Sequence, residues 1–234
     1  MEQQKNIWYV TLLLSSVAGF CDTVTFVAAE SIFSAHVTGN FIVFAYQMVK
    51  GSDAQAWVKL LTFPVFVLSV MVGGWMATRV KNRYTLIFTE GLILIISGIS
   101  FIVLDVLGFM DSYSWLLYLL TMFVVFAMGL QNAFGKLYAK ETHGPTTMMT
   151  GNVTQASLDL GGLLTSRFKD DAIFLSFKKQ LVTISGFLIG CLLGALLGKD
   201  FGLSSIILPG LGMVICYYSQ FQRIDMLSKI DSPI

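Results

Sequence analysis

The chain alternates long apolar stretches with short polar connections, a pattern typical of helices that cross a membrane. A helix needs about 20 apolar residues to span a bilayer, and six stretches are near this length: 7–29, 60–78, 84–107, 115–134, 181–198 and 203–218. The composition agrees, because 55% of the residues are hydrophobic, only 12% are charged and the mean hydropathy is +0.74. A soluble domain carries about twice this charged fraction. We therefore predict an all-α, polytopic protein embedded in a lipid bilayer.

Two further segments, 37–49 and 146–164, do not fit this pattern. The first is too short to cross a membrane alone at about 1.5 Å per residue. The second is too polar to face lipid, because it carries four threonines besides Asn152, Gln155, Ser157 and Asp159. We predict that both are re-entrant or broken half-helices.

The two half-helices carry the same motif, Thr38-Gly39-Asn40 in the first and Thr150-Gly151-Asn152 in the second. The preceding apolar runs also correspond, since Gly19 and Asp22 match Gly129 and Asn132 at an offset of about 110 residues. This spacing predicts one membrane domain built from two structural repeats, residues 1–110 and 111–234.

Small residues recur at every fourth position in one span of each repeat and predict close helix packing. They are Ser69, Gly73 and Ala77 in the first repeat, and Gly186, Gly190, Gly194 and Gly198 in the second. The partner of each ridge is either the other repeat or another copy of the chain in a homo-oligomer.

The distribution of basic residues predicts the topology, because lysine and arginine favour the cytoplasmic side. With re-entrant half-helices and a cytoplasmic N-terminus, twelve of the 15 basic residues face the cytoplasm, leaving outside Lys50, Lys59 and Lys199. Eight full crossings divide them nine to six, and crossing by the first half-helix alone divides them eleven to four. We therefore predict a multi-pass cell-membrane protein with both termini cytoplasmic and oppositely oriented repeats, a plan typical of transporters.

The Thr-Gly-Asn motifs are the candidate solute site. A helix start offers unpaired N–H groups and a partial positive charge, and glycine lets a solute approach the backbone. We expect a small polar or anionic solute to bind between the motifs near the bilayer midplane, with Gln131 and Asn132 adding neutral polar contacts. The alternative is that each motif only caps a buried helix.

Asp22 lies inside the first span, where an ionised carboxylate is costly and acidic residues tend to be functional. One hypothesis is that Asp22 takes up and releases a proton or a cation during transport. An equally weighted hypothesis is that it caps the broken region or binds Thr38 or Asn40, and so holds the half-helix in place.

Other polar residues are weaker candidates. His36 and His143 could carry protons, but loop positions at the membrane surface are favoured; Glu90 is near enough to the cytoplasmic end to reach water or a basic residue. Trp8, with three other tryptophans near span ends, is typical of an interfacial belt. The net charge of +1 and the absence of a basic cluster argue against a nucleic-acid partner, and we expect no metal or cofactor.

The motifs carry a family resemblance. The residues concerned are Ala18-Gly19-Phe20-Cys21-Asp22, His36-Val37-Thr38-Gly39-Asn40, Gly129-Leu130-Gln131-Asn132-Ala133 and Thr150-Gly151-Asn152. With them the chain resembles the YoaK-like family of bacterial integral membrane proteins, which carry a domain of unknown function. The resemblance implies a bacterial cell-membrane protein with about six spans and brings no substrate.

The resulting hypothesis is a small-solute secondary transporter or facilitator, with Asp22 as its proton-coupling group. A passive channel would share the architecture but tolerate Asp22→Asn. A membrane scaffold or accessory subunit would use the Thr-Gly-Asn motifs only structurally. An enzyme is disfavoured, because charged groups are few and no nucleophile or dinucleotide motif occurs.

Overall fold

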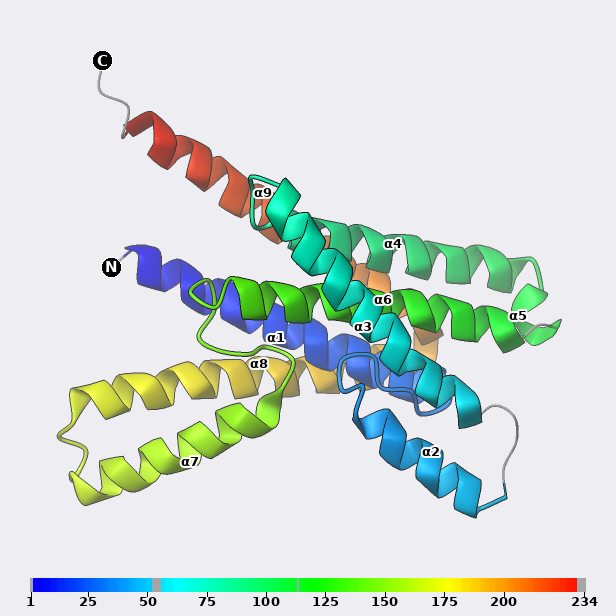
Figure 1. Ribbon diagram of the computed structural model, residues 1–234, viewed down its shortest axis with the longest axis horizontal. Helices are drawn as coiled ribbons and strands as arrows, with labels where there is room; N and C mark the ends of the chain where they lie inside the picture. The colour runs from blue at the N-terminus through cyan, green and yellow to red at the C-terminus, as the bar shows by residue number, and fades with distance from the viewer. Residues whose placement is uncertain (1, 52–55, 113, 231–234) are drawn as a thin grey trace.

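The computed structural model describes residues 2–51, 56–112 and 114–230, and these residues form helices and connecting turns with no strand (Figure 1). The elements, in chain order, are α1 (Glu2–Ala28), α2 (Gly39–Val49), α3 (Ala56–Arg79), α4 (Thr85–Val106), the short α5 (Phe109–Ser112), α6 (Ser114–Leu137), α7 (Met149–Thr165), α8 (Asp171–Phe201), the 3-10 turn η1 (Gly202–Ile206) and α9 (Ile207–Ile230). The prediction of an all-helical fold is confirmed.

Five helical stretches are long and apolar enough to cross a membrane: Ile7–Ala28, Ala56–Arg79, Thr85–Val106, Trp115–Leu137 and Asp171–Gln222. The last contains α8, η1 and α9 as far as Gln222, and therefore both of the last two predicted spans. Helix α2 is apolar but shorter. Length and composition thus identify a polytopic membrane protein.

Several helix boundaries differ from the prediction, since α3 begins at Ala56 rather than 60 and α9 covers Ile207–Ile230 rather than 203–218; for two others the local reason is visible. Helix α8 begins at Asp171 rather than at 181, because the Asp170 carboxylate accepts hydrogen bonds from the N–H groups of Ala172 and Ile173 at 3.0 and 3.1 Å. Helix α7 begins at Met149 rather than at 146, because Met148 is extended (φ −116°, ψ 94°). Polar residues alone therefore mark helix ends poorly in this chain.

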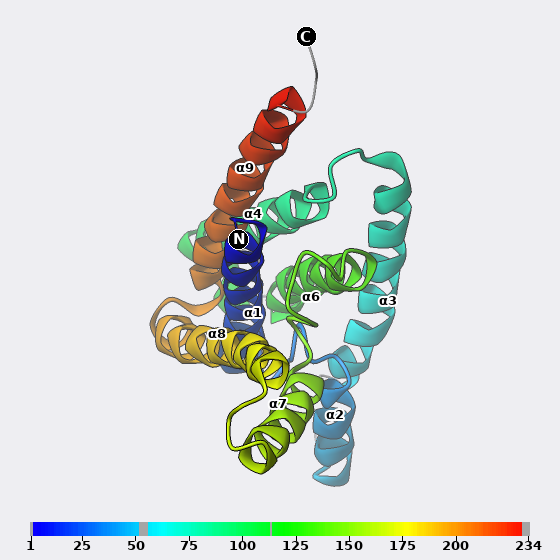
Figure 2. The same cartoon turned by 90° about the vertical axis from the view of Figure 1, so that its left-hand side faces the viewer.

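The helices share a long axis, and the connections gather at its two ends. The start of α1, the end of α9 and the α3–α4 and α7–α8 connections lie toward the left of Figure 1, whereas α5, the end of α2 and the start of α3 lie toward the right. Helices α2 and α7 begin near the middle and run outward in opposite directions, and their starts are neighbours in Figure 2 as well.

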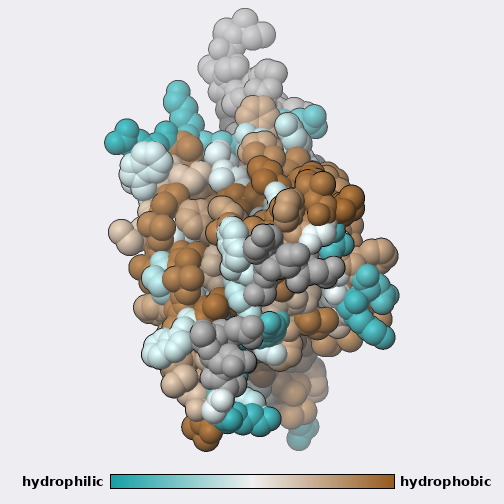
Figure 3. All heavy atoms as spheres, turned by 90° about the vertical axis from the view of Figure 1, so that its right-hand side faces the viewer, coloured by the Kyte–Doolittle hydropathy of each residue, from teal (hydrophilic) through white to brown (hydrophobic). Residues whose placement is uncertain are grey.

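Helix packing joins the two halves of the chain. Helix α1 packs most extensively against α8, α3 packs against α6, and α4 packs against both α6 and α9. The short helices stay within their halves, with α2 on α3 and α7 on α8. Hydrophobic side chains cover much of the visible surface in Figure 3, as lipid-facing helices require.

Both small-residue ridges pack inside this chain. A methyl group on Gly194 would lie 2.6 Å from the Phe20 carbonyl oxygen of α1, so α8 lies directly on the α1 backbone. In α3, Ser69 donates a hydrogen bond to the Phe126 carbonyl of α6, and a methyl on Gly73 would meet Ala133 at 2.6 Å. Each small-residue ridge therefore packs against the other half of the same chain, which was one of the two partners that the sequence allowed.

Candidate functional site

The Asp22 carboxylate holds the loop between α1 and α2. Its Oδ1 accepts hydrogen bonds from the N–H groups of Ala35 at 2.7 Å and His36 at 3.2 Å, and its Oδ2 lies 3.3 Å from His36 Nδ1. Asp22 is only 4% exposed. The predicted partners Thr38 and Asn40 are wrong, because the loop returns to α1 at Ala35, before the motif begins.

His36 is the one weaker candidate that the structure brings to Asp22. Its imidazole is partly exposed, and the hydrogen bond to Asp22 raises its pKa, an effect that partial burial opposes. The ring also lies edge-on to Phe187 of α8, with centroids 6.2 Å apart. Asp22 and His36 together form a hydrogen-bonded pair between α1, the loop and α8.

The two motif asparagines make equivalent internal bonds. Asn40 accepts from the Phe33 N–H and donates to the Phe33 carbonyl, both at 2.8 Å, and also donates to Thr62 Oγ1 at 3.0 Å. Asn152 donates to the Pro145 carbonyl at 2.7 Å. Each asparagine thus reaches back seven residues and ties the preceding loop to the first turn of its half-helix.

The start of α2 is already satisfied by its own loop. The N–H groups of Gly39, Asn40 and Phe41 donate to the carbonyls of His36, Val37 and Thr38 at 2.8–3.2 Å. Thr38 stands at the N-cap but its side chain makes no capping bond. The expectation of free N–H donors at the first motif is therefore wrong, since the loop carbonyls take them.

The start of α7 is more open. No turn bonds of this kind precede it among the described residues, and Thr150 and Gly151 lie exposed within its first turn. A methyl group on Gly151 would meet nothing within 4 Å, so no neighbour of the described chain explains a glycine there. Of the two motifs, the second can therefore offer backbone donors to a solute.

Gln131 and Asn132 fasten α6 to its surroundings. Gln131 Nε2 donates to the Leu14 carbonyl of α1 at 2.7 Å and to Thr146 Oγ1 at 2.9 Å, while Asn132 Oδ1 accepts from Thr147 Oγ1 at 2.7 Å. Gln131 is fully buried. It can reach a solute only if the helices part.

His143 and Glu90 lie apart from the motifs. The His143 N–H donates to Thr11 Oγ1 at 2.9 Å, which docks the α6–α7 loop on α1. Glu90 is 0% exposed, and neither carboxylate oxygen has a hydrogen-bond partner among the described residues. The expectation that Glu90 reaches water or a basic residue is wrong, because its side chain is fully buried and no basic residue pairs with it among the described residues.

Two glutamates that sequence reasoning missed make parallel contacts. Glu30, just after α1, accepts from the Tyr118 hydroxyl at 2.6 Å and lies 3.8 Å from the buried Lys59 ammonium. Glu141, just after α6, accepts from the Tyr84 hydroxyl at 2.6 Å and pairs with Arg83 at 3.0 Å. Both glutamates follow the first helix of their half of the chain, and this shared position is the sequence signal that could have identified them.

These contacts define an all-helical membrane protein with two internally tied half-helices. Within the described residues, no group of three side chains could hold a metal ion. The family described as "Protein of unknown function (DUF1275)" matches residues 10–219, and the chain belongs to that family. No curated protein and no solved structure matches the chain. The resemblance is thus confirmed at the level of an uncharacterised family, while the YoaK-like assignment and the bacterial origin stay predictions.

Proposed function

We propose that this protein is a proton-coupled transporter of a small polar or anionic solute, built from two inverted repeats. The observation that carries the proposal is the pair of half-helices, which begin near the middle of the molecule and run outward in opposite directions (Figures 1 and 2). Broken helices that start at membrane depth are a recurrent feature of transporter binding sites.

Crosswise packing supports the repeats. If α1–α4 correspond to α6–α9, then α1 on α8 corresponds to α6 on α3, and α4 on α6 corresponds to α9 on α1; all four contacts occur. The asparagine ties match as well, because Phe33 and Pro145 differ by the same 112 positions as Asn40 and Asn152. These equivalences favour two inverted copies of one unit.

The basic connections favour a cytoplasmic location for both termini. The α3–α4 and α7–α8 connections, which lie toward the same end as the termini, carry Arg83 and Lys81 in the first and Arg167 and Lys169 in the second. Basic residues flanking spans favour the cytoplasm. The opposite end would then face the outside of the cell.

The solute would bind at the start of α7. Thr150 and Gly151 are exposed there, and a helix start favours negative charge and acceptor oxygens. Gly151 leaves the backbone open to close approach. The buried Gln131 donates a hydrogen bond to Thr146 of the loop before α7, and it would join the site when that loop moves.

Coupling would reside in the Asp22–His36 pair. Protonation of the carboxylate would weaken its bonds to Ala35 and His36 and release the loop before α2. Asp22→Asn should then uncouple transport from the pH gradient. Gradient-dependent uptake that survives this change would remove Asp22 from the mechanism.

The test uses proteoliposomes that contain a pH-sensitive dye. Acetate, succinate and inorganic phosphate are added outside, one at a time, and proton movement is recorded. A hydrogen bond to a charged group contributes about 1.5–3 kcal/mol, so blocking the α7 backbone with Gly151→Val should slow a responding solute about tenfold or more. The matched control is Gly161→Val, at an exposed α7 glycine that also has nothing within 4 Å; equal effects of both changes would contradict the proposed site.

A membrane scaffold is the second candidate, favoured by the internal use of Asp22, Asn40 and Asn152. In a scaffold, Thr38→Val and Thr150→Val would alter stability at most and no flux would be found. A passive channel would instead show non-saturating flux that tolerates Asp22→Asn.

A further inference from the structure

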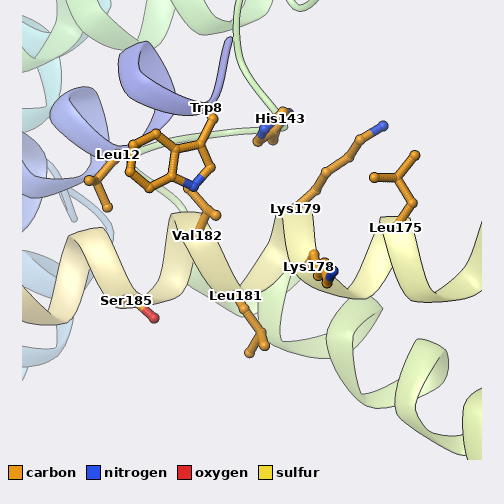
Figure 4. A pocket seen from close by; sticks show the side chains of 9 residues that line it. All are labelled: Trp8, Leu12, His143, Leu175, Lys178, Lys179, Leu181, Val182 and Ser185. Carbon is orange, nitrogen blue, oxygen red and sulfur yellow. The ribbon is translucent and has the colours of Figure 1, made fainter. Parts of the chain in front are cut away.

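A cleft of about 500 Å³ opens between α1, the α6–α7 loop and the first turns of α8, and no residue of the Thr-Gly-Asn motifs lines it (Figure 4). Trp8 and Leu12 of α1 form one wall, His143 of the loop closes another, and side chains of α8 form the floor. Nothing in the proposed transport site uses these residues, and the cleft therefore calls for a separate explanation.

The charges that line the cleft are all basic. They belong to Lys178 and Lys179 of α8, with His143 beside them, and no carboxylate lines the cleft among the described side chains. Burial and the neighbouring Lys179 charge lower the pKa of His143, in that order, so at neutral pH its ring is an uncharged partner for a polar group. Lys178 lies 4.2 Å from the centre of the Phe174 ring, which holds its ammonium near the cleft floor. This end of the cleft is complementary to an anion.

The other end of the cleft is apolar, with Leu12 and Val182 among its lining side chains. Helix α8 has 31 residues and is therefore about 46 Å long, whereas the hydrocarbon layer is about 30 Å thick. The long apolar part of α8 begins at Leu181, two residues after Lys179. A bilayer that covers this apolar part would place the lysines in its headgroup layer and the apolar end of the cleft in its acyl-chain layer.

Trp8 marks the same depth from the α1 side. Its indole is 47% exposed and lines the cleft above Leu12 and Val182 (Figure 4). Tryptophan concentrates at the boundary between headgroups and acyl chains. Anionic groups above this boundary and apolar chains below it are the two halves of a phospholipid.

We propose that this cleft binds one acidic phospholipid, with its phosphate between Lys178, Lys179 and His143 and an acyl chain along Leu12 and Val182. Basic pockets between membrane helices are suited to anionic headgroups. The bound lipid would bridge α1 and α8, the two helices that pack most extensively against each other.

The experiment measures lipid preference at Trp8 by fluorescence quenching. A variant that keeps Trp8 alone (Trp57→Phe, Trp75→Phe and Trp115→Phe) is reconstituted into phosphatidylcholine vesicles that contain increasing fractions of brominated phosphatidylglycerol or brominated phosphatidylcholine. The same titrations are run with Lys178→Gln plus Lys179→Gln. The matched control is Lys136→Gln plus Lys169→Gln, which removes two exposed charges outside the cleft.

The proposal expects brominated phosphatidylglycerol to quench Trp8 at a lower fraction than brominated phosphatidylcholine. Each cleft lysine should account for roughly a fivefold preference, so the double change should abolish most of it while the control keeps it. Equal quenching by the two lipids, or equal loss in the control, would overturn the proposal. Displacement of the brominated phosphatidylglycerol by millimolar inorganic phosphate would also overturn it, because the site would then serve a soluble anion.

Discussion

Replacing Gly190 by alanine tests how closely α8 lies on α1. The added methyl group would contact the Ser16 carbonyl oxygen and would lie 2.8 Å from the Ser16 carbonyl carbon and 2.9 Å from the Phe20 nitrogen. Ordinary contacts of such a methyl begin at about 3.4 Å. All three atoms belong to the α1 backbone, so no side chain can rotate away and the two helices must separate.

Two opposing effects determine the magnitude. Alanine favours a helix over glycine by up to about 1 kcal/mol, whereas overpacking a tight contact costs about 1–3 kcal/mol and occasionally more. Separation would also weaken the contacts at Gly186 and Gly194, which meet α1 equally closely. We therefore expect Gly190→Ala to lower the free energy of unfolding by about 2 kcal/mol.

The assay is reversible unfolding in mixed micelles, followed by tryptophan fluorescence and compared with Gly74→Ala. Gly74 lies within α3, where a methyl group would meet nothing within 4 Å. This control should be neutral or stabilised by up to about 1 kcal/mol. If Gly190→Ala proves as stable as Gly74→Ala, then α8 does not lie directly on the α1 backbone and the reasoning fails.

Four further changes test the internal ties and the buried charge. Asn40→Ala should destabilise the fold by about 2–3 kcal/mol and Asn152→Ala by about 1 kcal/mol, because Asn40 satisfies both backbone groups of Phe33; equal losses on chemical unfolding would contradict this. The raised pKa of His36 means that its protonation stabilises the folded state below its ordinary value of about 6.5 and that this contribution is lost as the pH rises through the higher folded-state value. The wild type should therefore exceed His36→Gln in melting temperature most clearly below about pH 6.5, and this excess should shrink as the pH rises through the higher folded-state pKa; a constant difference would exclude the ion pair. Glu90→Met should raise the unfolding free energy by about 1–3 kcal/mol, because it removes a buried carboxylate without partners; a decrease on thermal unfolding would mean that this carboxylate stabilises the fold.

The spans were predictable because lipid imposes a length on apolar helices that water does not. The predicted spans 7–29, 84–107 and 115–134 agree closely with the apolar parts of α1, α4 and α6. The start of α8 was not predictable from hydropathy, because a capped polar helix can continue beyond the hydrocarbon layer. The apolar pattern thus determines which residues can lie in lipid but not where each helix ends.

The positions of the motifs were predictable from their spacing, but their bonding partners were not. After α1 the chain turns through Glu30 and Ser31 at φ values of 52° and 62°, which few residues other than glycine adopt. This turn brings Ala35 back to Asp22. No pattern of apolar and polar residues reports such a backbone conformation, so the sequence placed Asp22 near the loop without identifying its contacts.

The differences between the two halves are more informative about function than their similarities. The asparagine tie occurs in both halves and therefore accounts for the shared motif as a structural device. Only the first half has the Asp22–His36 pair, and its half-helix start is closed by loop carbonyls. A methyl group on the motif glycine of the first half, Gly39, would meet the Phe33 ring at 3.0 Å, whereas one on Gly151 of the second half would meet nothing within 4 Å. Under the proposed function, proton binding and solute binding are thus divided between the halves. Helix packing connects them, because α1 carries Asp22 and packs on α8, and α8 supports α7.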